Sequence, residues 1–229
     1  MSEKDTPPKH ARIQGFRIKV EIGSIDRFLF WKSFTTYWTG QAFAIDTHRL
    51  VTCAHVVGRG KPVNVRFPNN LDLPAIARIL TFPESGPYGD IAIIEFTAPH
   101  GLPVVTQAAA NPAVGDKVMF DNKYGAFKEG VVHFYGDRGT IWRTLINAGI
   151  VNPNALPDTL ENRLKDADDA ALTDLYTDMP VRDGDSGSPV FNEQGELVGM
   201  AYATSKLTYQ SMVMPIEQMK AYIAQLLEQ

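Results

Sequence analysis

Short strand patterns, separated by turn residues, follow one another along most of the chain from residue 16 onward. Residues 16–22 alternate apolar and polar side chains, which is the period of a half-buried strand. Residues 40–45 and 49–52 flank the polar turn 46–48 and predict a hairpin. Further strands are predicted at 63–67, 75–80, 91–96, 117–120, 130–134, 140–146, 189–192, 197–203 and 210–214. Strands this short and this numerous favour an all-β fold of the barrel or sandwich type.

Two segments depart from the strand pattern and predict helices. Asp158 fits a helix cap, with Glu161 three positions later. The apolar residues that then share one helical face are Leu160, Leu164, Ala167, Ala171 and Leu175. Because residues 158–178 hold seven acidic side chains against two basic ones, we expect an extra acidic helical insertion near 158–176. A second helix is predicted over 215–229, where Pro215 suits a first turn and an apolar stripe indicates packing on the β body.

Composition restricts the partners and the compartment. The net charge is −4 without a sustained run of Lys or Arg, which disfavours nucleic acid, because phosphate binding needs clustered positive charge. No stretch approaches the roughly 20 apolar residues of a membrane span. Residues 1–10 are polar and lack the apolar core of a secretory signal, so we expect a disordered tail there. With Cys53 as the single cysteine, these features indicate a cytoplasmic location, although a mature secreted chain would look the same.

Three short motifs carry residue types that are used in nucleophilic catalysis. Residues 183–191 read DGDSGSPVF, in which the glycines around Ser186 let backbone N–H groups converge on one point. We therefore expect the N–H groups of Gly184 and Ser186 to form an oxyanion hole. His55 follows the predicted strand 49–52, and Asp90 directly precedes the apolar strand 91–96. An aspartate so placed can hold an imidazole in the tautomer that accepts a proton from serine.

Each motif alone also fits a structural role, as a glycine-serine turn, a solvated histidine or a turn-capping aspartate. Their order along the chain separates the classes of serine hydrolase. The α/β-hydrolases place the catalytic histidine after the nucleophile, whereas all five histidines here precede Ser186. Residues 184–188 also lack the second glycine of the G-x-S-x-G motif. The order His55, Asp90, Ser186 is that of chymotrypsin-like enzymes.

On the motifs VTCAHVV at 51–57, DIAII at 90–94 and GDSGSPV at 184–190, the chain resembles the trypsin/chymotrypsin superfamily of serine peptidases. It is most similar to disulfide-free, bacterial-type HtrA/Deg-like protease domains without a PDZ domain. The resemblance implies one peptidase domain over 11–229, built from two six-stranded antiparallel barrels (about 16–105 and 106–214) and the terminal helix. It further implies a serine endopeptidase that acts through an acyl-enzyme without metal or organic cofactor. Ser186 is then the nucleophile, His55 the base and Asp90 the orienting acid.

The resemblance also suggests where substrate specificity lies. In this superfamily the residue six positions before the nucleophile, here Pro180, lies at the base of the pocket for the P1 residue, which precedes the scissile bond. An uncharged base disfavours cleavage after Lys or Arg, and the strand that ends near Ala203 lacks the histidine of glutamate-specific relatives. We therefore expect a small or medium apolar P1 residue, with Val181 in the pocket and Thr204 and Ser211 narrowing it.

Alternatives to a constitutive peptidase stay open. The chain can be a catalytically silent barrel pair that binds a partner, because fold alone does not guarantee activity. It can also be an enzyme whose oxyanion loop is ordered by a protein activator, for which the acidic helix 158–176 is the candidate site. Finally, residues 12–15 resemble a zymogen cleavage site, after which the new amino terminus at Ile13 pairs with Asp185.

Overall fold

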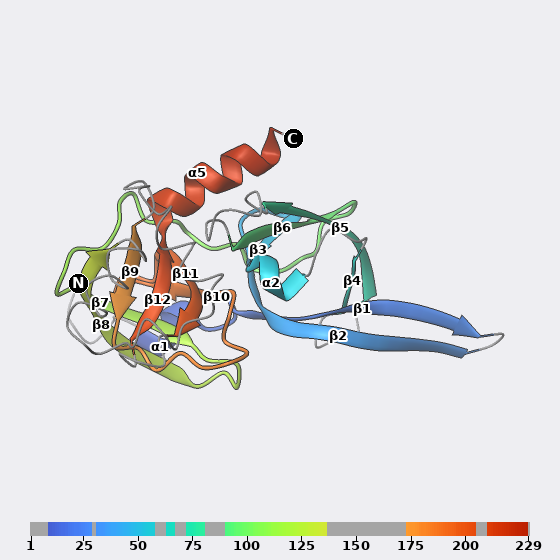
Figure 1. The fold of residues 1–229 in the computed structure, drawn as a ribbon, viewed down its shortest axis with the longest axis horizontal. Coiled ribbons are helices and arrows are strands. Elements are labelled where there is room, and N and C mark those ends of the chain that lie inside the picture. Colours follow the sequence, from blue (N-terminus) through green and yellow to red (C-terminus); the bar gives the residue numbers. More distant parts are fainter. Residues whose placement is uncertain are drawn as a thin grey trace, which may run out of the picture.

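Two antiparallel β-sheets, each closing on itself, form the body of the protein in a computed structural model (Figure 1). The structure describes residues 9–28, 31–57, 63–66, 72–80, 90–136, 173–204 and 210–228. Within these ranges the regular structure is mainly strand, with a long helix at the carboxyl end. The prediction of a mostly β fold with a C-terminal helix is therefore confirmed.

The first sheet has the strand order β1-β2-β3-β6-β5-β4 and closes through the pairing of β1 with β4. Its strands are β1 (Ile18–Phe28), β2 (Trp31–Ala44), β3 (Arg49–Thr52), β4 (Val63–Arg66), β5 (Asp72–Leu80) and β6 (Ile91–Phe96). Pairing of Phe43 with Val51 confirms the predicted hairpin around residues 46–48. β1 and β2 stay paired as far as Phe28 and Trp31 and project as a two-stranded ribbon (Figure 1). Residues 23–39 break the strict alternation, and the sequence pattern therefore misses this extension.

The second sheet has the strand order β10-β11-β12-β9-β8-β7 and closes where Phe191 of β10 pairs with Met119 of β7. Its strands are β7 (Lys117–Asp121), β8 (Phe127–Gly136), β9 (Asp174–Thr177), β10 (Ser188–Phe191), β11 (Leu197–Thr204) and β12 (Ser211–Pro215). Strands β9 and β10 are fully buried, as are the first six residues of β11. The loop that carries Ser186 thus leads directly into a buried strand.

The predicted acidic helix 158–176 is wrong at its carboxyl end. Residues Asp174 to Tyr176 belong to β9, in which Leu175 pairs with Val213 of β12 and Tyr176 pairs with Phe134 of β8. Four residues are too few for a periodicity to separate strand from helix, and pairing with two distant strands decides the matter. The remainder of that predicted helix, and the predicted strand 140–146, lie outside the described residues.

A short helix, α1 (Lys9–Ile13), precedes β1 and packs on the second sheet. Lys9 Nζ lies 3.0 Å from Glu129 Oε1 and 2.6 Å from Glu193 Oε1, and Ile13 is buried in the core. The expectation of a disordered tail over 1–10 is therefore wrong at Lys9 and His10, which belong to this helix. Residues 1–8 lie outside the described residues. Its ion pairs are with residues far away in the sequence, one in β8 and one in the turn between β10 and β11, and no local pattern reveals them.

The C-terminal helix, α5 (Ile216–Leu227), begins one residue later than predicted. Pro215 ends β12 and caps the helix from an extended conformation (φ −67°, ψ 155°). Ile216, Met219, Tyr222 and Leu226 form its buried stripe. The helix contacts β5 and β6 of the first sheet as well as β11 and β12 of the second, so it bridges both (Figure 1). None of the helices in the described ranges has the length and apolar character needed to cross a membrane.

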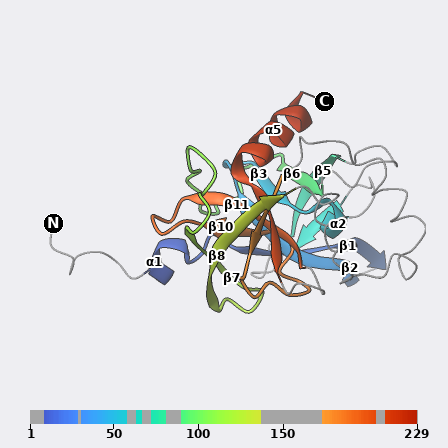
Figure 2. The ribbon, with the colours of Figure 1, turned by 60° about the vertical axis from the view of Figure 1, so that its left-hand side comes forward.

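The two sheets meet along β2 and β10, and Figure 2 shows their contact from a second direction. One buried cluster contains Phe43 and Val51 of the first sheet together with Phe191 and Met200 of the second. The shared core fixes the two sheets against each other and so fixes any site built between them.

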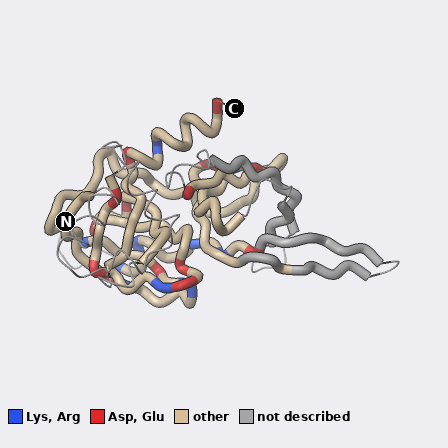
Figure 3. Tube along the Cα trace, in the orientation of Figure 1, with Lys and Arg blue, Asp and Glu red and all other residues tan. Residues whose placement is uncertain are grey.

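Along the described chain, Lys and Arg are interspersed with Asp and Glu (Figure 3).

Candidate active site

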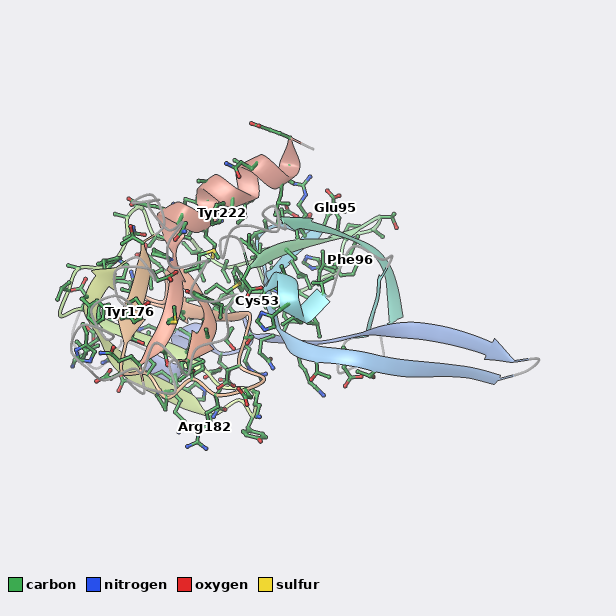
Figure 4. The ribbon with its side chains drawn as sticks, viewed as in Figure 1. Cys53, Glu95, Phe96, Tyr176, Arg182 and Tyr222 are labelled. Carbon is green, nitrogen blue, oxygen red and sulfur yellow. The ribbon has the colours of Figure 1, made fainter. Side chains whose placement is uncertain are left out.

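His55 is presented by a single helical turn, α2 (Ala54–Val57), at the end of β3. Thr52 and Cys53 before it are buried, and so are Val56 and Val57 after it, which leaves the imidazole exposed over about half of its surface (51%). Cys53 lies between the two sheets (Figure 4), where its Sγ is 3.7 Å from the Ala201 carbonyl of β11. The turn that carries His55 is therefore held by its buried neighbours in the chain and by a contact with the second sheet.

Asp90 directly precedes β6, and strand pairing brings it to His55. β3 runs antiparallel to β6 with Thr52 opposite Ala92, so the end of β3 lies beside the start of β6. Asp90 Oδ1 accepts a hydrogen bond from the His55 backbone N–H at 2.9 Å, and Asp90 Oδ2 lies 2.5 Å from His55 Nδ1. One carboxylate thus binds both the main chain and the ring of His55. The structure brings these two predicted site residues together.

The Asp90 contact fixes how the imidazole uses its two nitrogens. A carboxylate only accepts hydrogen bonds, so Nδ1 carries a proton and Nε2 is left as the acceptor. The hydrogen bond to Asp90 raises the pKa of His55 above its ordinary value, and the negative charge acts in the same direction against burial, which lowers it. The ring is therefore a base with a defined proton-accepting atom and a stabilised charged form.

Cys53, His55 and Asp90 also place one potential metal-ligand atom each within 4.8 Å of one another. Two ligands on a tetrahedral ion with bonds of about 2.0 Å lie about 3.3 Å apart. His55 Nδ1 and Asp90 Oδ2 are separated by only 2.5 Å, which is a hydrogen-bond distance. The arrangement is therefore that of a hydrogen-bonded pair, and we assign no metal to it.

The loop that carries Ser186 is held by its backbone and by Asp185. Gly184 and Gly187 have φ angles of +90° and +88°, which glycine adopts without the strain that a side chain brings. Asp185 is buried, and its carboxylate accepts hydrogen bonds from the N–H groups of Lys123 (2.6 Å) and Arg182 (2.9 Å). Gly187 N–H donates to the Ala201 carbonyl at 2.8 Å. The serine thus sits on a sharply turned segment that is held at Asp185 and Gly187.

Gln41 of β2 joins this loop to the sheet that carries His55. Its N–H donates to the Ser186 carbonyl at 2.9 Å, and its side-chain Nε2 donates to the Gly184 carbonyl at 3.0 Å. Its own carbonyl accepts a hydrogen bond from Thr52 Oγ1 at 2.6 Å, three residues before His55. Arg17 Nη1 orients the Gln41 side chain from 2.6 Å. Sequence reasoning missed Gln41 and Arg17, and no local motif marks them.

The Ser186 hydroxyl is half-buried and donates to the Tyr202 carbonyl at 3.4 Å. Within the described residues it makes no hydrogen bond to the His55 ring. The N–H groups of Gly184 and Ser186, the expected oxyanion donors, have no acceptor among those residues either. Both residues are half-buried, so their main chain is partly open to solvent.

Of the expected specificity residues, Val181, Thr204 and Ser211 are joined by hydrogen bonds. Val181 N–H donates to the buried Ser211 hydroxyl at 3.3 Å, and Thr204 Oγ1 donates to the Val181 carbonyl at 2.8 Å. Ser211 Oγ also donates to the Met179 carbonyl, so its proton and one of its two acceptor positions are directed at the main chain. Pro180 is exposed and Ala203 is half-buried.

The possible zymogen site is folded into the body of the intact chain. Ile13 is the last residue of α1 and is buried. The Asp185 carboxylate, its expected partner after cleavage, is already satisfied by the N–H groups of Lys123 and Arg182. Asp185 therefore needs no new amino terminus as a partner in this state.

Comparisons with known proteins identify the family and the fold of the chain. A family model described as a trypsin-like peptidase domain matches residues 39–200, a range that includes His55, Asp90 and Ser186. No curated protein sequence matches the chain. Among solved structures, the inactive form of the Rv3671c protease is similar with a TM-score of 0.60 and 18% identity, over 96% of this chain and 92% of that one. A serine-to-alanine mutant of Rv3671c from M. tuberculosis H37Rv, also in an inactive form, gives the same TM-score and identity over 96% and 90%.

Proposed function

Because the chain belongs to the trypsin-like peptidase domain family, we propose that it is a serine endopeptidase of the chymotrypsin-like, two-barrel kind. The observation that carries the proposal is the Asp90 carboxylate, which binds both the N–H and the Nδ1 of His55. A carboxylate in that position holds the imidazole as a base whose free nitrogen faces away from it. Family membership supports the same reaction class.

The proposed reaction begins with a rotation of the Ser186 hydroxyl from the Tyr202 carbonyl toward His55 Nε2. Oγ then attacks the peptide carbonyl while Nε2 takes its proton, and Asp90 stabilises the imidazolium. The N–H groups of Gly184 and Ser186 bind the oxyanion. His55 returns the proton to the leaving amine, and water hydrolyses the resulting acyl-enzyme by the same route. The substrate is a protein or peptide, and the reaction uses no metal or organic cofactor.

For specificity we propose a small or medium apolar P1 residue. No acidic side chain is present among Pro180, Val181, Ala203, Thr204 and Ser211 to attract Lys or Arg, and the Ser211 hydroxyl is occupied by main-chain groups. Cleavage-site profiling with a proteome-derived peptide library tests this proposal. Cleavage mainly after Lys, Arg or Glu contradicts it.

Labelling with a fluorophosphonate serine probe tests the proposed function, with Ser186→Ala as the matched variant. We expect wild type to be labelled and to hydrolyse an unfolded protein substrate, and Ser186→Ala to do neither. Equal labelling of both proteins places the reactive serine elsewhere. Absence of labelling and of hydrolysis in wild type contradicts the proposal for the isolated chain.

The orientation of the Ser186 hydroxyl favours one alternative, an enzyme that becomes active only when a protein partner binds. If no partner activates it, the chain is a catalytically silent binding module. The hydroxyl donates to Tyr202 and not to His55 in the free chain. The expected activator site, the acidic segment 158–176, lies outside the described residues except for its end in β9. Under this alternative wild type is labelled only after a partner is added, or never.

A further inference from the structure

Lys123 contacts three consecutive residues of the loop that carries Ser186. It lies in the turn between β7 and β8, and its Nζ donates to the Asp183 carbonyl at 2.7 Å. Its aliphatic stem covers Gly184, where an added Cβ would lie 3.0 Å from Lys123 Cδ. Its backbone N–H donates to Asp185 Oδ1 at 2.6 Å. No other residue in the described ranges makes all three of these contacts.

The contact with Asp183 determines the direction of the Gly184 N–H. In a trans peptide the C=O and the following N–H point in opposite directions. Because the Asp183 carbonyl is turned toward the Lys123 ammonium, the Gly184 N–H points away from the β7–β8 turn. That N–H has no acceptor within the described residues. It is one of the two donors assigned to the oxyanion.

Gly184 itself permits the opposite orientation of this peptide. Gly184 has a φ of +90° and no side chain, so rotation of the Asp183–Gly184 peptide meets little resistance from Gly184 itself. A rotated peptide directs the Asp183 carbonyl oxygen to the place where the N–H is needed. A carbonyl oxygen there repels the negative charge that develops on the substrate. The orientation of one peptide therefore switches this donor on or off.

We propose that the Lys123 ammonium is a positioning group that keeps this peptide in the donor orientation and so maintains the oxyanion hole. The inference rests on the proposed peptidase function, because it assigns a task within that reaction. Lys123 itself touches neither the serine nor the substrate carbonyl. It acts through the Asp183 carbonyl, with a charge-assisted hydrogen bond that is stronger than a neutral one.

The turn that carries Lys123 is itself held by hydrogen bonds, and the ammonium has one further contact. Arg17 Nη1 donates to the Lys123 carbonyl at 3.3 Å. Asn122 Oδ1 accepts hydrogen bonds from the N–H groups of Tyr124 (3.0 Å) and Ala126 (2.9 Å), which closes the turn around Lys123. The Tyr124 ring lies 5.1 Å from Lys123 Nζ, within the range of a cation–π contact.

Kinetics of Lys123→Met test the proposal, because methionine keeps the length of the stem and removes the charge. Loss of one oxyanion donor lowers kcat by about 10²–10³-fold, and we expect a loss of about 10-fold or more, since the peptide samples both orientations. KM should stay within about twofold, because the oxyanion forms only in the transition state. Lys123→Arg should recover most of the activity. Lys117→Met, an exposed lysine of β7 with the same change in charge, is the control and should match wild type.

A kcat of Lys123→Met equal to that of Lys117→Met overturns the proposal, and so does a rise in KM with kcat unchanged. A second measurement does not depend on catalysis. In nitrogen-15 NMR spectra the Gly184 amide should shift in Lys123→Met relative to wild type and Lys117→Met, and an unshifted resonance overturns the proposal. If wild type shows no hydrolysis or labelling, the proposed function fails, while an unshifted Gly184 resonance still overturns the role of Lys123 separately.

Discussion

Replacement of Asp90 by asparagine tests the central contact of the proposed site. The carboxylate offers one oxygen to the His55 N–H and the other to Nδ1. The side-chain amide of the Asp90→Asn variant has only one oxygen. If that oxygen keeps the hydrogen bond to the His55 backbone N–H, the NH₂ group of the amide faces Nδ1. Nδ1 must then accept, the ring proton moves to Nε2, and the imidazole no longer takes a proton from Ser186.

The size of the effect follows from these contacts. Loss of the hydrogen bond between Nδ1 and the charged carboxylate costs about 1.5–3 kcal/mol. If the amide turns so that its oxygen faces Nδ1, the correct tautomer is restored, but the hydrogen bond to the His55 N–H is lost, which costs about 0.5–1.5 kcal/mol. The sum of about 2–4.5 kcal/mol lowers kcat/KM by roughly 30- to 2,000-fold. Loss of charge stabilisation of the imidazolium adds to this, and an Asp-to-Asn change in a triad lowers kcat by about 10⁴. We expect a decrease of about 10³–10⁴-fold.

The assay is kcat/KM on a chromogenic peptide substrate, with the rate of fluorophosphonate labelling as a second measure. Asp46→Asn is a matched control, because Asp46 Oδ1 also accepts a hydrogen bond from the N–H of a histidine, His48, at 2.7 Å. That variant should keep wild-type activity. A loss of less than tenfold in Asp90→Asn, with thermal stability close to that of wild type, refutes the role assigned to Asp90.

Two further predictions concern stability and pH. Gly187→Ala places a Cβ 1.9 Å from the Gln41 carbonyl oxygen at a φ of +88°, so we expect a loss of at least about 3 kcal/mol in the free energy of unfolding. Gly101→Ala, at a φ of +68° with open space around it, should cost only about 1–2 kcal/mol, and equal losses in urea denaturation contradict the argument. Because the pKa of His55 is raised above 6.5, protonated His55 stabilises the fold below that pH, and the contribution is lost as pH rises through the folded pKa. The stability advantage of wild type over His55→Ala should therefore shrink from pH 5.5 to pH 9, and the acid limb of kcat/KM should lie above pH 6.5.

Part of the candidate site was predictable because its signals are local. The glycines around Ser186 mark a sharply turned loop, and their φ angles bear this out. The strands before His55 and after Asp90 stand out as apolar runs, and both form as predicted. Gln41, Arg17 and Lys123 carry no such signal. Each acts on residues far away in the sequence, as Lys123 does on Asp183 across 60 positions.

The failures of the sequence pattern have the same origin. The helical stripe that ends at Leu175 runs into β9, because pairing with β8 and β12 outweighs a local helical preference. Helix α1 begins inside the expected tail, at Lys9 and His10, and its contacts are with distant residues: Lys9 pairs with Glu129 and Glu193, and Ile13 is buried in the core. A short segment has too little intrinsic preference to resist such contacts.

The strand-rich character of the chain, the C-terminal helix and the order of the three candidate catalytic residues can be read from the sequence alone. These features depend on alternation and on short motifs, which act between neighbours along the chain. The tertiary structure was needed to show that β3 pairs with β6, which brings Asp90 to His55, and that Gln41 and Lys123 donate hydrogen bonds to the Ser186 loop. Such contacts form when distant strands close into a sheet and bury a common core. Their free energy belongs to the whole fold, and no local segment encodes it.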